Sequence, residues 1–169
     1  SFTAEEIYEN LPGERLDSVF LAEWYTGLFA LTDADMDRAF WQQVQDVKQA
    51  VNKAIENARR DKLIKGGLGA EVVLYVDDGQ RTLLNRLGDE LRFVTITSAA
   101  TLKSLGEAPA ELEDTAVSGL KVQVLASEYG KCARCWHHQP DVGSHAEHPE
   151  LCGRCVTNVD GEGEVRRYA

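Results

Sequence analysis

Four cysteines near the end of the chain constrain its fold more than any other feature. They form two C-x2-C pairs, Cys132 with Cys135 and Cys152 with Cys155, and 16 residues separate the pairs. The two-residue gap lets both thiolates of a pair point into one turn of backbone, and two such turns supply the four soft ligands that suit Zn²⁺. Four protein ligands leave no open coordination position, so the spacing predicts one structural zinc ion.

Two alternatives to a four-cysteine site remain open at this point. The cysteines could form two disulfides or stay free at the surface, although residues 1–6 are acidic and do not resemble a secretory signal. One of the histidines between the two pairs could also replace a cysteine as ligand. These histidines are His137, His138, His145 and His148.

Basic and aromatic side chains flank the cysteines. A zinc ion with four thiolates carries about two negative charges, which Lys131, Arg134 and Arg154 are placed to offset. Trp136 has two interpretations: it packs over the zinc turns as a small core, or it exposes a ring that stacks on an unpaired base. The candidate nucleic-acid contacts are Trp136, Arg134, His137, Arg154, Arg166 and Arg167; the arginines are equally compatible with a solvated surface.

The rest of the chain divides by its hydrophobic pattern. A capping box at Thr3 and Glu6 predicts a short helix to about residue 10, and residues 19–31 are apolar without clear periodicity. Apolar residues at gaps of three and four predict a long helix within 33–62. The residues on this apolar helix face are Phe40, Val44, Val47, Val51, Ala54 or Ile55, and Ala58.

Residues 70–127 have the pattern of a small α/β unit. Strands are predicted at 71–76, 92–97 and 120–125, with a helix over 81–91 and an exposed loop over 104–119. The order strand, helix, strand favours a parallel pair. We therefore predict three parts, with boundaries at 1–65, 66–127 and 128–169.

Composition and missing motifs narrow the function. The net charge of −10 argues mildly against a nucleic-acid binder, although a total can hide a local basic patch. The sequence contains no run of about 20 apolar residues and none of the common phosphate-binding or hydrolase motifs. The only methionine is Met36, so the sequence is expected to be a piece of a longer chain.

Several motifs together resemble the C-terminal region of bacterial isoleucyl-tRNA synthetases. They include FTAEEI (2–7), LPGE (11–14), EWY (23–25), VNKAIE (51–56) and GDELRFV (88–94). The motifs CARCWH (132–137) and CGRCV (152–156) complete the resemblance. Ala133 departs from a position where that family often has Pro, and the loop 104–116 diverges.

The resemblance implies a multi-part α+β fold. Residues 1–65 would be a helical segment from an anticodon-binding bundle, 66–127 a small α/β junction, and 128–169 a C-terminal four-cysteine zinc ribbon or knuckle. It further implies binding to the anticodon stem-loop of the isoleucine tRNA, with the remaining domains of the parent ligase as partners. ATP would bind only in the absent catalytic domain, so this part would neither activate isoleucine nor edit. The resemblance also implies a cytoplasmic monomer that binds neither DNA nor membranes.

Two other classes of protein use similar zinc modules. The same cysteine spacing resembles the zinc finger of formamidopyrimidine-DNA glycosylases, but the rest of the chain does not resemble those enzymes. A zinc ribbon that docks to another protein is the third interpretation. Enrichment of isoleucine tRNA from a cell extract would support the synthetase interpretation, whereas retention of a protein partner without RNA would support the docking adapter.

Overall fold

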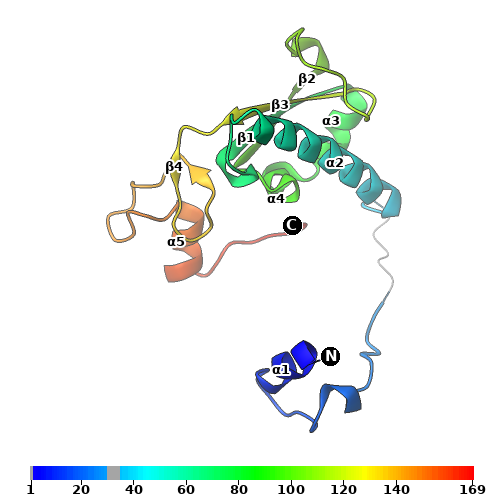
Figure 1. Cartoon of the computed structure of the whole chain (residues 1–169), viewed down its shortest axis with the longest axis vertical. Coiled ribbons are helices and arrows are strands. Elements are labelled where there is room, and N and C mark those ends of the chain that lie inside the picture. The colour runs from blue at the N-terminus through cyan, green and yellow to red at the C-terminus, as the bar shows by residue number, and fades with distance from the viewer. Residues whose placement is uncertain (1, 30–34) are drawn as a thin grey trace. The chain divides into compact units, whose positions relative to one another are not determined.

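The computed structural model describes residues 2–29 and 35–169. The chain divides into two compact units, one within residues 1–34 and one formed by residues 35–169 (Figure 1). No helix among the described residues is both long enough and apolar enough to cross a membrane.

The first unit contains helix α1 (Phe2–Glu9), as predicted, and a single 3-10 turn at Val19–Leu21. The Glu5 carboxylate joins these elements, because it accepts hydrogen bonds from the Ser18 hydroxyl at 3.0 Å and from the Val19 amide at 3.3 Å. None of the described residues of this unit is buried. Its exposed apolar side chains include Phe2, Phe20, Trp24, Tyr25, Leu28 and Phe29. Local hydrogen bonds rather than a core therefore hold its described part.

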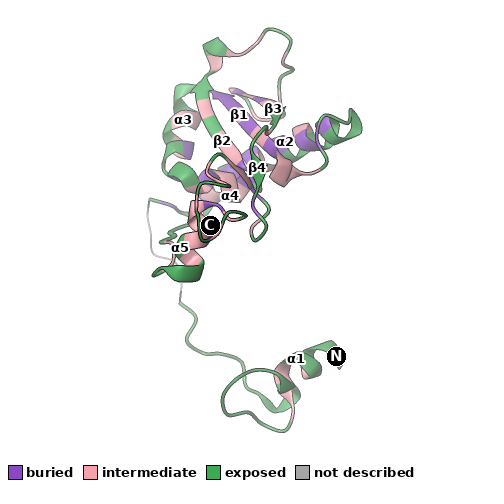
Figure 2. Ribbon diagram, turned by 90° about the vertical axis from the view of Figure 1, so that its left-hand side faces the viewer, coloured by how far each residue is buried: buried purple, intermediate pink, exposed green. Residues whose placement is uncertain are grey.

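Helix α2 (Arg38–Arg60) is the long helix that the periodicity predicts; residues 33 and 34 of the predicted range lie outside the described residues. The Asp37 side chain caps its start by accepting a hydrogen bond from the Phe40 amide at 2.8 Å. Its buried face is Phe40, Val44, Val47, Ala50, Val51, Ile55 and Ala58. Ile55 is buried, whereas Ala54 is half-buried and packs against the same core. Figure 2 shows buried segments along α2.

A three-stranded sheet forms the second half of this core. Strand β1 (Ala70–Val76) lies in the centre, parallel to β2 (Ala99–Ser104) and antiparallel to β3 (Leu120–Ala126). The register pairs Glu71 with Ala99 on one side and with Leu125 on the other. Apolar side chains of α2 and the sheet form one continuous core. The α+β fold is confirmed. A parallel pair is present, but its second strand is 99–104 rather than the predicted 92–97, and the three-part division stays a prediction.

The predicted strand at 92–97 is wrong, because residues Leu91–Thr95 form helix α4. Leu91 and Thr95 are buried one turn apart, and the Thr95 hydroxyl donates a hydrogen bond to the Leu91 carbonyl at 3.0 Å. The helix ends at Ile96 in a left-handed conformation, and the strand begins at Ala99. Tertiary packing overrides the β-propensity of this segment.

The predicted helix over 81–91 is also divided. Helix α3 (Asp78–Asn85) ends before Gly88, whose φ of 52° interrupts the helix, and a 3-10 turn (Gly88–Glu90) leads into α4. The segment 104–119 contains one 3-10 turn, Leu105–Glu107, and is otherwise the mostly exposed loop that composition predicts. The turn before α4 places Glu90 and Phe93 where the C-terminal segment of the chain contacts this unit.

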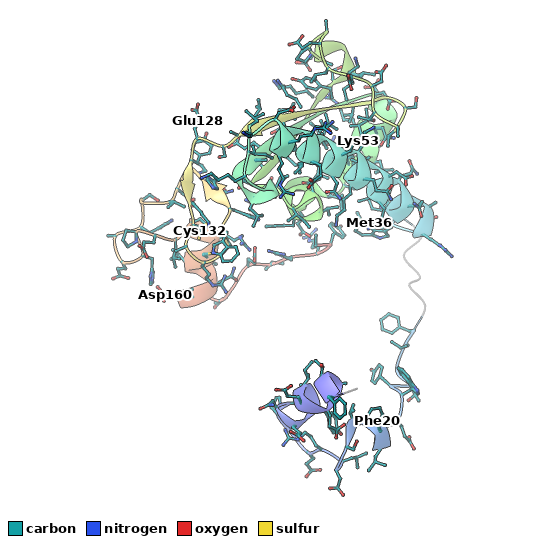
Figure 3. All side chains as sticks on the ribbon, viewed as in Figure 1. Phe20, Met36, Lys53, Glu128, Cys132 and Asp160 are labelled. Carbon is teal, nitrogen blue, oxygen red and sulfur yellow. The ribbon has the colours of Figure 1, made fainter. Side chains whose placement is uncertain are left out.

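Residues 128–169 form a small module with little regular structure. A short hairpin pairs β4 (Gly130–Lys131) with β5 (His138–Gln139), and helix α5 (Gly153–Asp160) begins at the second cysteine pair. Its core consists of the four cysteines with Val142 and Leu151 and is separate from the main core. Side chains around Cys132 and Asp160 are drawn in Figure 3. So small a core predicts that a metal ion is needed for stability.

Candidate metal centre

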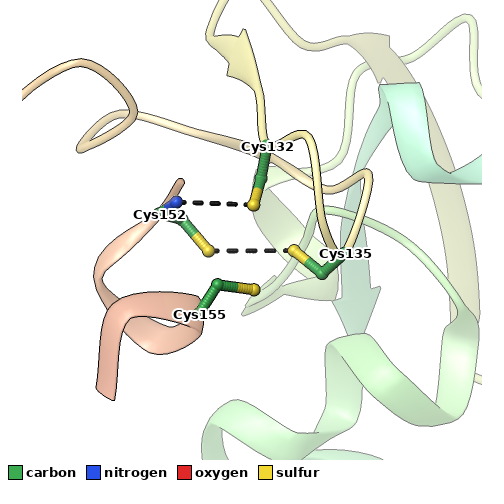
Figure 4. A group of neighbouring side chains, drawn as sticks. All are labelled: Cys132, Cys135, Cys152 and Cys155. Atoms are coloured by element: carbon green, nitrogen blue, oxygen red, sulfur yellow. Dashed lines mark hydrogen bonds between the residues drawn. The ribbon is translucent and has the colours of Figure 1, made fainter. Parts of the chain in front are cut away.

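The four cysteine sulfurs converge from two separate turns of the chain. Cys132 and Cys135 follow β4, whereas Cys152 caps helix α5 and Cys155 lies in its first turn (Figure 4). All four sulfurs lie within 4.8 Å of one another, and those of Cys135 and Cys152 are 3.7 Å apart. A tetrahedron with Zn–S bonds of about 2.3 Å has edges of about 3.8 Å. The donor set therefore fits one zinc ion with four sulfur ligands.

The geometry decides between the alternatives that the spacing left open. All four cysteines are free thiols, so the two-disulfide alternative does not hold. Three of them are buried, which excludes loose surface cysteines. The convergent group contains four cysteines and no histidine, so the zinc ligand set is complete without one. The zinc site is structural, because every coordination position is taken by the protein.

Because the cysteine cluster is buried, its thiols can all ionise only if a cation is bound among them. Burial raises the pKa of Cys152 to about 12, with the neighbouring thiols adding to the effect. Burial also opposes ionisation of Cys132, but backbone N–H groups from Cys135, Cys152 and Arg134 outweigh it and lower its pKa to about 6. Four ionised thiolates in this space need a compensating charge, which a divalent ion supplies when bound.

Two of the three expected cations reach the sulfurs. The Arg134 guanidinium lies 3.6 Å from the Cys155 sulfur. Burial disfavours the charge on Arg154, but contacts with Cys135 and Glu164 outweigh it and raise its pKa. Lys131 instead lies over the ring of Trp136, with its ammonium 5.1 Å from the ring centroid. Arg134 and Arg154 are therefore the side chains that offset the thiolate charge.

Trp136 is held away from the zinc turns rather than packed over them. Its side chain is 58% exposed, and its backbone has a φ of 66°. The left-handed region is unfavourable for a bulky residue, and here the Trp136 amide donates to the Cys132 carbonyl at 3.0 Å. The turn that encloses the metal thus fixes an exposed indole at its outer surface.

The remaining predicted contact residues gather elsewhere, around Phe93 of α4. The His137 ring stacks on Phe93 with centroids 5.7 Å apart, and the Arg166 guanidinium lies 3.9 Å from the centroid of that ring. Arg154 lies 5.2 Å from the same centroid and forms an ion pair with Glu164 at 2.7 Å. The predicted set therefore splits: His137, Arg154 and Arg166 contact Phe93, whereas Arg134 and Trp136 lie at the first cysteine pair.

Arg167 lies apart from both groups, on the C-terminal tail beside Glu90, a contact that the sequence does not predict. Its backbone amide, like those of Tyr168 and Ala169, donates to the Glu90 carboxylate at distances of 2.8, 2.6 and 2.9 Å. Burial alone would raise the pKa of Glu90, but these three donors outweigh it and lower the pKa. Glu90 and Phe93 both lie in the motif GDELRFV, which was the available signal for their importance.

Comparison with known protein families identifies the class of the metal module. Residues 130–158 match the family of zinc fingers found in FPG and IleRS, which covers the hairpin, all four cysteines and most of α5. This match identifies the module as a zinc finger of that class and agrees with the sulfur geometry.

The whole chain is similar to part of isoleucine–tRNA ligase. It is 82% identical over its full length to the enzyme of Alcanivorax borkumensis, 58% identical to that of Azotobacter vinelandii and 57% identical to that of Pseudomonas paraeruginosa. In each case the match covers 100% of this chain and 18% of the relative. The predicted resemblance to the C-terminal region of these ligases is confirmed.

Proposed function

We propose that this chain is the tRNA-binding C-terminal part of an isoleucine–tRNA ligase and that its zinc finger contacts the anticodon stem-loop of the isoleucine tRNA. The parent enzyme would join isoleucine to that tRNA with ATP bound in its other domains, in the cytoplasm and as a monomer. The similarity to isoleucine–tRNA ligases over the full chain supports the enzyme class.

The single observation that supports RNA contact most strongly is the exposure of Trp136. A protein that only needed to enclose zinc would place a glycine or a small residue at a left-handed position, yet this chain holds a tryptophan there. The Lys131 ammonium lies 5.1 Å from the centroid of the indole ring, and Arg134, two residues before Trp136 in the chain, is also exposed. An aromatic face flanked by positive charge is suited to stack on an unpaired base and to contact the adjacent phosphates.

The arrangement gives each predicted contact residue a role. Trp136 would stack on a base of the anticodon loop, and Arg134 would contact phosphate or a base edge beside it. Arg167 has an exposed side chain on the C-terminal tail and is available for phosphate contact. His137, Arg154 and Arg166 pack on Phe93 and would act on RNA through the placement of the module.

The test is a binding measurement with the zinc-loaded chain and a transcript of the isoleucine tRNA. Trp136→Ala should weaken binding by about 5- to 150-fold, because stacking on a base contributes about 1–3 kcal/mol. Leu125→Ala is the control, since Leu125 is an exposed apolar side chain of β3, outside the zinc module and outside residues 1–65. Zinc content should be equal in all three proteins.

Two results would contradict the proposal. An unchanged dissociation constant for Trp136→Ala would exclude stacking by this residue. Equal affinity for the isoleucine tRNA and for a tRNA with another anticodon would exclude specific contact with the anticodon. Preference for duplex DNA would favour the glycosylase-type zinc finger, and retention of a protein partner without RNA would favour the docking adapter.

A further inference from the structure

Two sets of contacts join the zinc module to the α/β unit. The first set is at Ser98, whose hydroxyl accepts a hydrogen bond from the His138 amide at 2.6 Å and whose carbonyl accepts one from the Gln139 side chain at 2.9 Å. These bonds hold the hairpin at one point. A single point of attachment leaves a small module free to rotate about it.

The second set is at Glu90 and Phe93. Glu90 accepts hydrogen bonds from three consecutive amides at the end of the chain, which its two carboxylate oxygens share. Bonds to a charged acceptor are stronger than neutral ones, and three of them define the path of the tail. Glu90 therefore ties the tail to the 3-10 turn that precedes α4.

Phe93 is the point at which the tail and the zinc turns meet. Arg166 from the tail, Arg154 from α5 and His137 from the zinc hairpin all contact its ring. Glu164 keeps the two arginines in place, with ion pairs of 2.7 Å to Arg154 and 3.2 Å to Arg166. One aromatic ring on α4 is thus contacted from three segments of the module.

The contact with Phe93 also affects Trp136, because His137 follows Trp136 in the chain. His137 is 7% exposed, and its carbonyl accepts a hydrogen bond from the Cys132 amide at 2.9 Å. The stack of His137 on Phe93 therefore immobilises the residue that follows Trp136 in the chain. Trp136 is exposed and its ring contacts Lys131, a residue of the same hairpin, so its direction depends on how this hairpin is held.

We infer that Glu90 and Phe93 are positioning residues for RNA binding: they hold the zinc module at a second point and so fix the direction of Trp136 relative to the α/β unit. This inference rests on the proposed function. Neither residue touches RNA; both act through the placement of the module.

The experiment compares Glu90→Ala and Phe93→Leu with the full zinc-loaded chain. Phe93→Leu keeps apolar volume but removes the ring face that the cations and His137 contact. Asp89→Ala is the matched control, because it removes a neighbouring exposed carboxylate of the same charge. Zinc content and the spectrum of the main core should be unchanged in all variants.

The first readout needs no RNA. Residual dipolar couplings of the zinc module and of the sheet should fit one common alignment in the wild-type chain and in Asp89→Ala. Each variant removes one half of the second attachment, either the Glu90 bonds to the tail or the Phe93 contacts with the module, so the fit to one common alignment should worsen in both. A single alignment in both variants would overturn the inference.

The second readout is the affinity for the isoleucine tRNA. Glu90→Ala should weaken binding by roughly 2- to 10-fold, because Glu90 affects RNA binding through the placement of the zinc module. The same change in a Trp136→Ala background should cause a clearly smaller loss, which comes from Arg167 alone. An equal loss in both backgrounds would overturn the inference, because Glu90 would then act independently of Trp136. If Trp136→Ala alone changes nothing, the proposed function fails, and the dipolar couplings still decide whether Glu90 and Phe93 hold the module.

Discussion

The imidazole of His137 stacks on the ring of Phe93, with centroids 5.7 Å apart and planes inclined by 23°. This contact joins the zinc hairpin to helix α4, two segments that are distant in the sequence. It orients the first turn of the metal site and, through the adjacent residue, the exposed indole of Trp136. The zinc turns and the C-terminal tail therefore both contact α4 or the turn before it, and each contact can be tested by a separate substitution.

Removal of zinc should unfold the module and leave the main core intact. The cysteine cluster is the principal core of residues 128–160, whereas α2 and the sheet share a separate apolar core. A chelator should therefore collapse the amide spectrum of residues 128–160 while the signals of 38–60 and 70–76 persist. Native chemical shifts throughout the module without metal would contradict a structural role for the ion.

Gly153→Ala should destabilise the module. A β-carbon at this position would lie 2.7 Å from Oδ2 of Asp141, the atom that accepts the Gly153 amide at 2.7 Å. Disturbing a partly buried hydrogen bond to a charged group costs about 1–3 kcal/mol, and zinc affinity should fall with it. Zinc competition and denaturant unfolding measure both effects.

The control for that substitution is Gly66→Ala. No atom lies within 4 Å of the β-carbon position at Gly66, and its backbone is extended. This variant should match the wild-type chain in zinc affinity. An equal loss in both variants would show that the contact with Asp141 is not the cause.

Trp136→Gly should be more stable than Trp136→Ala by about 1 kcal/mol, although glycine is normally the less stabilising residue. The reason is the φ of 66° at this position, which glycine adopts without steric cost. Both variants lack the indole and should bind the isoleucine tRNA equally weakly. A more stable alanine variant would mean that the left-handed conformation is not retained in solution.

Acid should release the tail from Glu90. The three backbone donors lower the pKa of Glu90 below its usual value of 4.5, despite opposing burial. A carboxyl group with a lowered pKa stabilises the fold above its unfolded value, and this contribution is lost as the pH falls through the folded value. The carboxyl carbon of Glu90 should therefore titrate with a midpoint below 4.5, and a midpoint at or above 4.5 would contradict the tail contact.

Local patterns predicted the parts of this protein that depend on neighbours in sequence. The spacing of Phe40, Val44, Val47 and Val51 predicts α2 because helix periodicity is a short-range property. The cysteine spacing predicts the metal site for the same reason, since each pair is confined to one turn. Only the choice between Ala54 and Ile55 needed the structure.

The errors and omissions arise from long-range contacts. Residues 92–97 have the composition of a strand, but 92–95 are helical, with Leu91 and Thr95 buried one turn apart. The contact between Glu90 and Arg167 joins residues 77 positions apart, and nothing near either residue indicates it. The contact of Arg166 with Phe93 is also long-range, so the sequence does not indicate it, and RNA contact by the tail arginines stays a prediction.

The most direct test of the structural zinc is the metal content of the purified chain together with X-ray absorption at the zinc edge. The expected result is one zinc ion per chain, bound by four sulfurs at about 2.3 Å and by no nitrogen or oxygen ligand. Absence of zinc from a folded module, or a first coordination shell with fewer than four sulfurs, would contradict it.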